Sequence, residues 1–155
     1  MILYCMENCR TAEQGAEMQR LEAAGLCLFC PAGLRQQARQ EILWETPHWT
    51  VTPNKYPYYG TSVHLLLVPH EHAGDLLDLT PAAQQDFWNA LTTIRERFDL
   101  EYYGLGVRNG DCRFTGATIA HVHAHVVVGD SDAADEVPVR MRFSSRPGSR
   151  DPLSP

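Results

Sequence analysis

The sequence predicts a single α+β domain. Short apolar segments alternate with polar residues as strands do, one longer segment repeats apolar residues at helical spacing, and no internal repeat divides the chain. A chain of 155 residues with 44% hydrophobic residues is large enough for one packed core. We therefore expect one domain over residues 1–155, with a helical extension at 1–25, a core at 26–130 and a partly flexible tail at 131–155.

The first half of the chain predicts a helix and then a pair of strands. Residues 11–24 have helix-forming composition and end at Gly25, a residue that commonly terminates helices. A strand, a turn and a second strand are predicted by "EILWETPHWTVTPNKYPYYGTSVHLLLVPHEH", in which aromatic and β-branched residues alternate with polar ones.

The second half contains the clearest helix and the last strands. In "LTPAAQQDFWNALTTIRERFDL", Thr80 is a good N-cap, Pro81 suits the first helical position, and one apolar stripe follows, made of Phe87, Leu91, Ile94 and Phe98. "YYGLGVRNG" predicts a strand that ends in a turn at Asn109–Gly110. A further strand is predicted at "ATIAHVHAHVVV", and the tail offers one edge-strand candidate at "VPVRMRF".

Charge and composition limit the partners. A net charge of -6 argues against nucleic acid as a partner. No apolar run is long enough for a signal sequence or a membrane span, so we expect a cytoplasmic protein without membrane contact. The tail contains four arginines: Arg140, Arg142, Arg146 and Arg150. We expect these side chains to be solvated at a frayed chain end rather than to contact an anion or a partner. In a cytoplasmic protein, five cysteines favour reduced thiols over disulfides. We expect these thiols to bind metal or to pack in the protein.

Three histidines on alternate residues mark "TGATIAHVHAHVVVGD" as a functional segment. If it is a strand, His121, His123 and His125 share one face at steps of about 6.6 Å, since side chains alternate between faces every 3.3 Å. The small apolar residues between them would form the packed face. Such a row of imidazoles can bind a metal, or handle phosphate and protons together.

The histidine row resembles a known signature. "HVHAHVV" fits His-φ-His-φ-His-φ-φ, which is the signature of the histidine triad (HIT) nucleotide hydrolases and transferases. "CLFC", "PNKYPY", "VHLLLVPHEH" and "RNGDCRFTGATIA" follow the order of that family, so the resemblance covers Leu26 to Gly129. It implies a HIT-like fold with a five-stranded antiparallel sheet and two main helices, usually as a homodimer.

The resemblance also implies roles for individual residues. His123 would attack the α-phosphate of a nucleotide, which suits a neutral imidazole because it is both a good nucleophile and a good leaving group. His125 would contact phosphate and protonate the leaving group. The remaining implied substrate-binding residues are Thr118, Asn54, Asn109 and His64. For both asparagines, ordinary turn chemistry is an equal alternative. Ala117 departs from the family, because many relatives have Gln at that position.

Cys27 and Cys30 of "CLFC" have the spacing by which two thiolates hold one tetrahedral Zn²⁺, although redox chemistry or burial would also suit such a pair. The zinc-binding branch of the HIT superfamily implies two histidine partners, here His72 and His121, and hence a structural zinc site. His70 is the competing assignment for His72. Cys5 and Cys9 form a looser pair without a histidine partner, and we expect Cys112 to be a packing residue.

The family resemblance favours a hydrolase that cleaves nucleoside phosphoramidates or dinucleoside polyphosphates through a nucleotidyl-histidine, with a purine nucleotide as the expected substrate. His125 favours a hydrolase over a transferase or phosphorylase with the same intermediate, whereas "NKYPY" resembles the transferase relatives. A zinc-stabilised nucleotide-binding module with little turnover is the alternative from another class. A catalytic metal centre on the histidine row is disfavoured, because residues at i, i+2 and i+4 of a strand splay too far apart to close on one ion.

Overall fold

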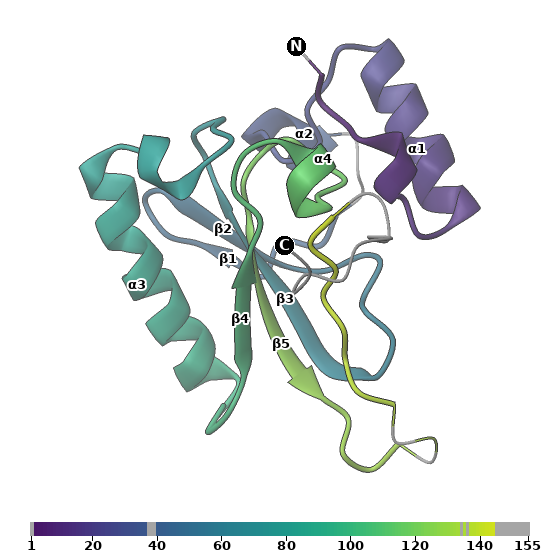
Figure 1. Cartoon of the computed structure of the whole chain (residues 1–155). Coiled ribbons are helices and arrows are strands. Elements are labelled where there is room, and N and C mark those ends of the chain that lie inside the picture. The colour runs from purple at the N-terminus through teal and green to yellow at the C-terminus, as the bar shows by residue number, and fades with distance from the viewer. Residues whose placement is uncertain (1, 37–39, 134, 136, 145–155) are drawn as a thin grey trace, which may run out of the picture.

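The computed structural model describes residues 2–36, 40–133, 135 and 137–144. Within these residues one antiparallel sheet has the strand order β1-β2-β3-β5-β4 (Figure 1). The strands are β1 (Trp44–Glu45), β2 (Trp49–Pro53), β3 (Thr61–Pro69), β4 (Gly104–Val107) and β5 (Ala124–Gly129). The sheet confirms the predicted fold class.

Two longer helices and several short ones surround this sheet. They are η1 (Met6–Asn8), α1 (Ala12–Ala23), α2 (Pro31–Gln36), η2 (Leu76–Asp78), α3 (Pro81–Arg97) and α4 (Cys112–Thr115). The predicted starts of the two long helices are confirmed by their N-caps. Thr11 accepts a hydrogen bond from the Gln14 N–H at the start of α1, and Thr80 accepts one from the Ala83 N–H at the start of α3. No helix in the described part of the chain is long and apolar enough to cross a membrane.

Alternation along the central strands divides the core between the two faces of the sheet. Leu65 and Leu67 of β3 pack with α3 on one face, and Ala124 of β5 joins them there. Leu66 and Val68 point to the other face, where α1, α2 and the N-terminal segment cover them with Tyr4, Met18, Leu21, Leu28, Phe29 and Leu34. Figure 1 shows α3 on one side of the sheet and α1 and α2 on the other. The histidine row therefore belongs to the face that the N-terminal segment covers.

The last strand is shorter than the sequence predicts. β5 begins at Ala124 and not at Ala117, so His121 and His123 precede the regular strand. The segment before β5 bonds to other parts of the chain instead: the Ala120 N–H donates to the Leu3 carbonyl, and the Val122 N–H donates to the Ala73 carbonyl. These long-range partners replace the sheet ladder, and they could not be read from the local pattern.

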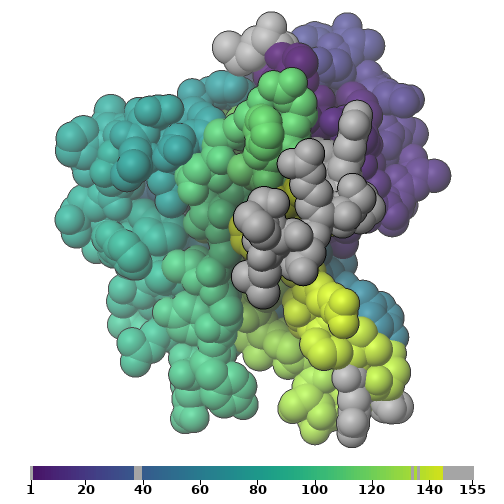
Figure 2. Space-filling view, viewed as in Figure 1, coloured from purple at the N-terminus to yellow at the C-terminus, as the bar shows by residue number. Residues whose placement is uncertain are grey.

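The predicted edge strand at 137–143 is wrong, because no strand forms there. The segment instead runs beside the sheet, in yellow in Figure 1, and Figure 2 shows its residues on the surface of this side of the molecule. Its backbone is held where the Arg142 carbonyl accepts two hydrogen bonds from Arg108. Gly116 at the end of α4 makes room for it, since a Cβ there would lie 2.9 Å from the Arg142 carbonyl oxygen and its φ is +76°. Arg146 and Arg150 lie outside the described residues.

The expectation that all the cysteines are reduced is also wrong for two of them. Cys5 and Cys112 are joined by a disulfide across 107 positions of sequence, so Cys112 is more than a packing residue. The Cys5 N–H donates to the Thr118 carbonyl, and this contact holds the N-terminal segment against the residues that follow α4. Cys9, Cys27 and Cys30 are free thiols.

Candidate functional site

The site is a cavity of about 340 Å³ on the face of the sheet that carries the histidines. This volume lies within the range of small-molecule sites, about 300–1,000 Å³. Segments far apart in sequence form its wall. The N-terminal segment contributes Arg10 and Met18, the β2–β3 loop contributes Tyr58, and the tail contributes Arg142. His125 lines it from β5 and His123 from the position just before that strand, since Ala124 between them points to the opposite face.

His123 is held as a neutral ring with one nitrogen available. Its Nδ1–H donates to the carbonyl of His121 at 2.8 Å, and a carbonyl can only accept, so Nε2 carries the lone pair. Phe29 packs its edge against the imidazole, with 4.7 Å between ring centres. Burial is the main cause that lowers the pKa of His123 to about 4; the positive charge of Arg108 acts in the same direction and the bond to the His121 carbonyl in the opposite one. The result is an uncharged imidazole whose orientation is fixed by the backbone.

His125 is oriented by a chain of hydrogen bonds that begins at the backbone. The Tyr58 N–H can only donate, so Nδ1 of His64 accepts it at 3.0 Å and the neutral ring carries its proton on Nε2. That Nε2–H donates to Nδ1 of His125 at 2.9 Å, which leaves the His125 proton on its own Nε2. Asn54 Nδ2 is a second donor 3.1 Å from His64 Nε2, so in this tautomer the contact is not a hydrogen bond. Burial is the main cause that lowers the pKa of His64, to about 4, and that of His125.

Arg108 lies beside His125 and was not predicted as a site residue. It is only 9% exposed, its Nη1 donates to the Tyr58 hydroxyl at 2.7 Å, and the same atom lies 3.4 Å from Nε2 of His125. Its position follows from strand register: β4 pairs with β5 with Gly106 opposite His125, and Arg108 comes directly after β4. The sequence signal was the arginine before the Asn109–Gly110 turn, but only the register places it at the triad.

The substrate-binding candidates divide between the cavity and its surroundings. Thr118 and Asn54 line the cavity; the Thr118 hydroxyl donates to the Asn8 carbonyl, and the Asn54 side chain accepts from the Tyr56 N–H. Asn109 is not among the described residues that line it, because its side chain accepts from the Leu76 N–H at 2.9 Å and holds that loop. His64 stands behind His125, where it orients that ring.

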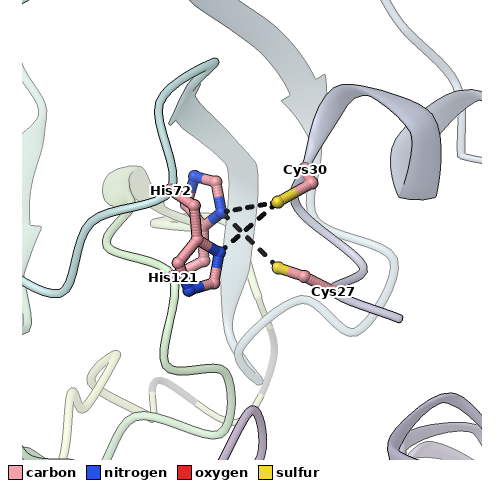
Figure 3. A group of neighbouring side chains, drawn as sticks. All are labelled: Cys27, Cys30, His72 and His121. Carbon is pink, nitrogen blue, oxygen red and sulfur yellow. Dashed lines mark hydrogen bonds between the residues drawn. The ribbon is translucent and has the colours of Figure 1, made fainter. Parts of the chain in front are cut away.

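The predicted zinc residues come together at one point beside the triad. The ligand atoms of Cys27, Cys30, His72 and His121 all lie within 4.8 Å of one another. Figure 3 shows the two thiols facing the two imidazoles, with the cysteines near α2 and the histidines on separate segments. His70, the competing assignment, instead lies 3.2 Å from the Thr50 hydroxyl and 3.8 Å from a Glu45 oxygen.

The distances within this cluster suit a tetrahedral zinc ion. Zn–S and Zn–N bonds of 2.3 and 2.0–2.1 Å place neighbouring ligands about 3.3–3.8 Å apart. Nδ1 of His121 lies 3.5 and 3.8 Å from the two sulfurs, and Nδ1 of His72 lies 3.4 Å from Cys30 Sγ. The His121 Nε2–H donates to the Pro69 carbonyl at 2.9 Å, which leaves Nδ1 as the lone-pair atom that faces the sulfurs. The donor set and its spacing therefore fit zinc.

The fold and the histidine geometry agree with one family of known proteins. The family model described as HIT domain matches residues 35–132, which is more than half of the chain. The chain belongs to the HIT family. None of the curated proteins compared with this HIT protein gives a significant match.

Solved structures with the same fold include several HIT proteins. A HIT family hydrolase from Clostridium thermocellum is 22% identical, with a TM-score of 0.55 over 72% of this chain and 96% of that one. A Zn-bound histidine triad family protein from Mycobacterium smegmatis is 23% identical, with a TM-score of 0.54 over 75% of this chain and 82% of that one. A hypothetical protein from Leishmania major is 23% identical, with a TM-score of 0.57 over 76% and 86%. At these identities the likeness establishes the fold.

Proposed function

We propose that this HIT protein is a nucleotide hydrolase that cleaves at the α-phosphate through a covalent nucleotidyl group on His123. The observation that carries the proposal is the hydrogen bond from His123 Nδ1–H to the His121 carbonyl. It keeps the Nε2 lone pair free beside the cavity that His123 lines, next to His125, with 4.9 Å between the two ring centres.

The proposed reaction has two displacements at phosphorus. Nε2 of His123 attacks the α-phosphate, the bond from phosphorus to the leaving group breaks, and its electron pair goes to the leaving group. The ring becomes cationic, and its Nδ1–H donates more strongly to the His121 carbonyl. Water then attacks the same phosphorus, the P–N bond returns its electrons to Nε2, and one proton of the water is released. Nε2–H of His125 would donate to the phosphate oxygens, and the Thr118 hydroxyl would do so after turning its proton away from the Asn8 carbonyl.

The apolar part of the cavity suits a nucleobase. Met18, Leu28, Phe29, Leu66 and Ile119 line one region of the wall, which supports a purine packed against them. Asn54, which lines the same cavity, is the residue we assign to the ribose.

The edge strand β4 exposes Leu105, and Tyr103 lies exposed just before it. Both residues support the homodimer that the family implies.

We further propose that Cys27, Cys30, His72 and His121 hold one structural Zn²⁺. The ligand spacing within this HIT protein supports this assignment, and the Mycobacterium smegmatis relative is described as Zn-bound. The four protein ligands would leave the ion no open position, so it would supply cross-linking rather than catalysis. It would tie the segment before α2 to the segment that precedes His123.

Intact-protein mass spectrometry tests the proposed intermediate. The protein is mixed briefly with adenosine and guanosine phosphoramidates and dinucleoside polyphosphates and quenched at neutral to alkaline pH. We expect a nucleotide-sized adduct on the wild type and none on His123→Ala. His48→Ala is the matched control, because its ring lies outside the cavity, and it should form the adduct normally. Nucleotide binding without turnover or adduct would identify a binding module instead of an enzyme.

A further inference from the structure

The cavity wall is cationic in a protein whose overall charge is negative. The chain has a net charge of -6, yet no aspartate or glutamate is among the described residues that line the cavity. Five basic side chains do line it: Arg10, Lys55, Arg108, Arg140 and Arg142. Lys55 is neutralised by an ion pair with Glu17 at 2.9 Å. The arginines have no such partner within the part of the chain that the structure describes, and the cavity therefore concentrates positive charge.

Arg108 is the most buried of these arginines, and all its recorded partners are neutral. Among the described residues they are the Arg142 carbonyl, the Tyr58 hydroxyl, the ring of His125 and the aromatic faces of Tyr58 and Phe143. A buried guanidinium without a counter-charge is costly, and an anionic ligand in the cavity would compensate for it.

Arg10 approaches the same aromatic ring from the N-terminal segment. Its Cζ lies 4.8 Å from the centre of the Tyr58 ring, and the Cζ of Arg108 lies 5.8 Å from that centre. Its guanidinium donates to the carbonyls of Tyr56 and Pro57, which fixes its position. Partial desolvation of the guanidinium, and then the charges of Arg108 and Arg142, lower the pKa of Arg10, as expected for neighbouring cations without an anion between them.

A contact between two donors marks where the missing anion belongs. The hydrogen-bond chain through His64 leaves the proton of His125 on Nε2, and Arg108 Nη1 lies only 3.4 Å from that atom. Two N–H groups at this distance cannot satisfy each other. One acceptor oxygen placed between them would satisfy both, and a phosphate oxygen has the charge and the lone pairs to do so.

We propose that Arg10, Arg108 and Arg142 form a subsite for an anionic leaving group, so that the preferred substrates join the nucleotidyl group to phosphate rather than to an amine. This inference rests on the proposed function and decides between its two substrate classes. A phosphate leaving group departs with the bonding electron pair on its oxygen and needs no proton. An amine must be protonated to depart, and a neutral His125 next to Arg108 is a poor source of that proton. The subsite therefore favours dinucleoside polyphosphates.

Binding of inorganic pyrophosphate tests the subsite without any turnover. Calorimetry would compare the wild-type protein with the Arg10→Gln, Arg142→Gln double variant, whose two side chains are exposed and whose removal should leave the fold intact. Arg113→Gln is the matched control, because Arg113 pairs with Asp111 outside the cavity. We expect pyrophosphate to bind the wild type and the control alike, and the double variant about 10- to 100-fold more weakly per lost charge-assisted contact. Equal binding to all three proteins would overturn the subsite.

Substrate competition tests the specificity that follows from it. We would measure kcat/KM for diadenosine tetraphosphate and for adenosine 5′-phosphoramidate in the same three proteins. The wild type and the control should prefer the tetraphosphate, and the ratio of the two constants should fall at least about 10-fold in the double variant. A wild-type preference for the phosphoramidate, or an unchanged ratio in the double variant, would refute the inference while the hydrolase remained. Pyrophosphate binding without turnover of either substrate would instead refute the proposed function and leave the subsite standing.

Discussion

Asn8 connects the N-terminal segment to the loop before the triad, and its removal gives a calculable loss of stability. The side chain is 2% exposed, and its Nδ2 donates to the carbonyls of Ala117 at 2.8 Å and of Cys112 at 3.2 Å. In Asn8→Ala the Cys112 carbonyl still accepts a hydrogen bond from the Gly116 N–H. Losing the bond from Asn8 to this carbonyl therefore costs about 1 kcal/mol. The buried Ala117 carbonyl has no other donor among the residues that the structure describes, so leaving it unsatisfied adds about 1–3 kcal/mol. The buried Oδ1 of Asn8 has no hydrogen-bond partner among the described residues, so its removal offsets part of this cost, and we expect the free energy of unfolding to fall by about 1–3 kcal/mol.

Urea denaturation without reductant measures this loss, so that the disulfide stays intact in every variant. Asn89→Ala is the matched control, because Asn89 is exposed on α3 and makes one bond of 3.3 Å to Asp86, and its loss should stay within about 0.5 kcal/mol. In Asn8→Asp a carboxylate would face the Ala117 carbonyl, so the loss at neutral pH should exceed that of Asn8→Ala and shrink as the acid is protonated. A loss below about 1 kcal/mol for Asn8→Ala at an unchanged m-value would refute the reasoning.

Two further predictions concern pH and metal. The pKa of His64 is about 4 in the folded protein, with Arg10 and Arg108 among its charged neighbours, whereas the unfolded chain has the ordinary value near 6.5. The unfolded chain therefore binds this proton first, and stability should decrease as the pH falls from 6.5 to 4, by at most about 1.4 kcal/mol per pH unit for this group. His64→Gln should show a shallower slope by urea denaturation across this window, and parallel slopes would contradict the assignment. For the metal, we expect about one zinc per chain by elemental analysis and a lower melting temperature after chelation. Cys30→Ser should lose the zinc and Cys9→Ser, a free thiol outside the cluster, should retain it, so equal zinc contents would exclude the site.

Local signals were sufficient to predict the two longer helices, α1 and α3, and the central strands, but not the short helices. Thr80 and Pro81 fix the start of α3 through contacts within a few residues, and the alternation of Leu65 to Val68 assigns both faces of β3. The start of β5 could not be predicted in this way. Its preceding residues bond to Leu3 and Ala73, which are distant in sequence.

Which site residues could be predicted depends on the same difference between local patterns and long-range contacts. The spacing of Cys27 and Cys30 and the alternation of the triad are short-range patterns, and the fold brings the residues they indicate together. The Cys5–Cys112 disulfide and the position of Arg108 depend on contacts across the chain or on the register of β4 against β5, and neither leaves a local pattern. Asn109 shows the opposite case, since a family position is used here to hold the loop at Leu76.

The stereochemical course at phosphorus tests the covalent histidine intermediate most directly. A nucleotide substrate with a chiral α-phosphorothioate would be hydrolysed in ¹⁸O-labelled water, and the configuration of the product determined. Two successive displacements, first by His123 and then by water, predict overall retention. Inversion would mean that water attacks the substrate directly, and it would contradict a nucleotidyl group on His123.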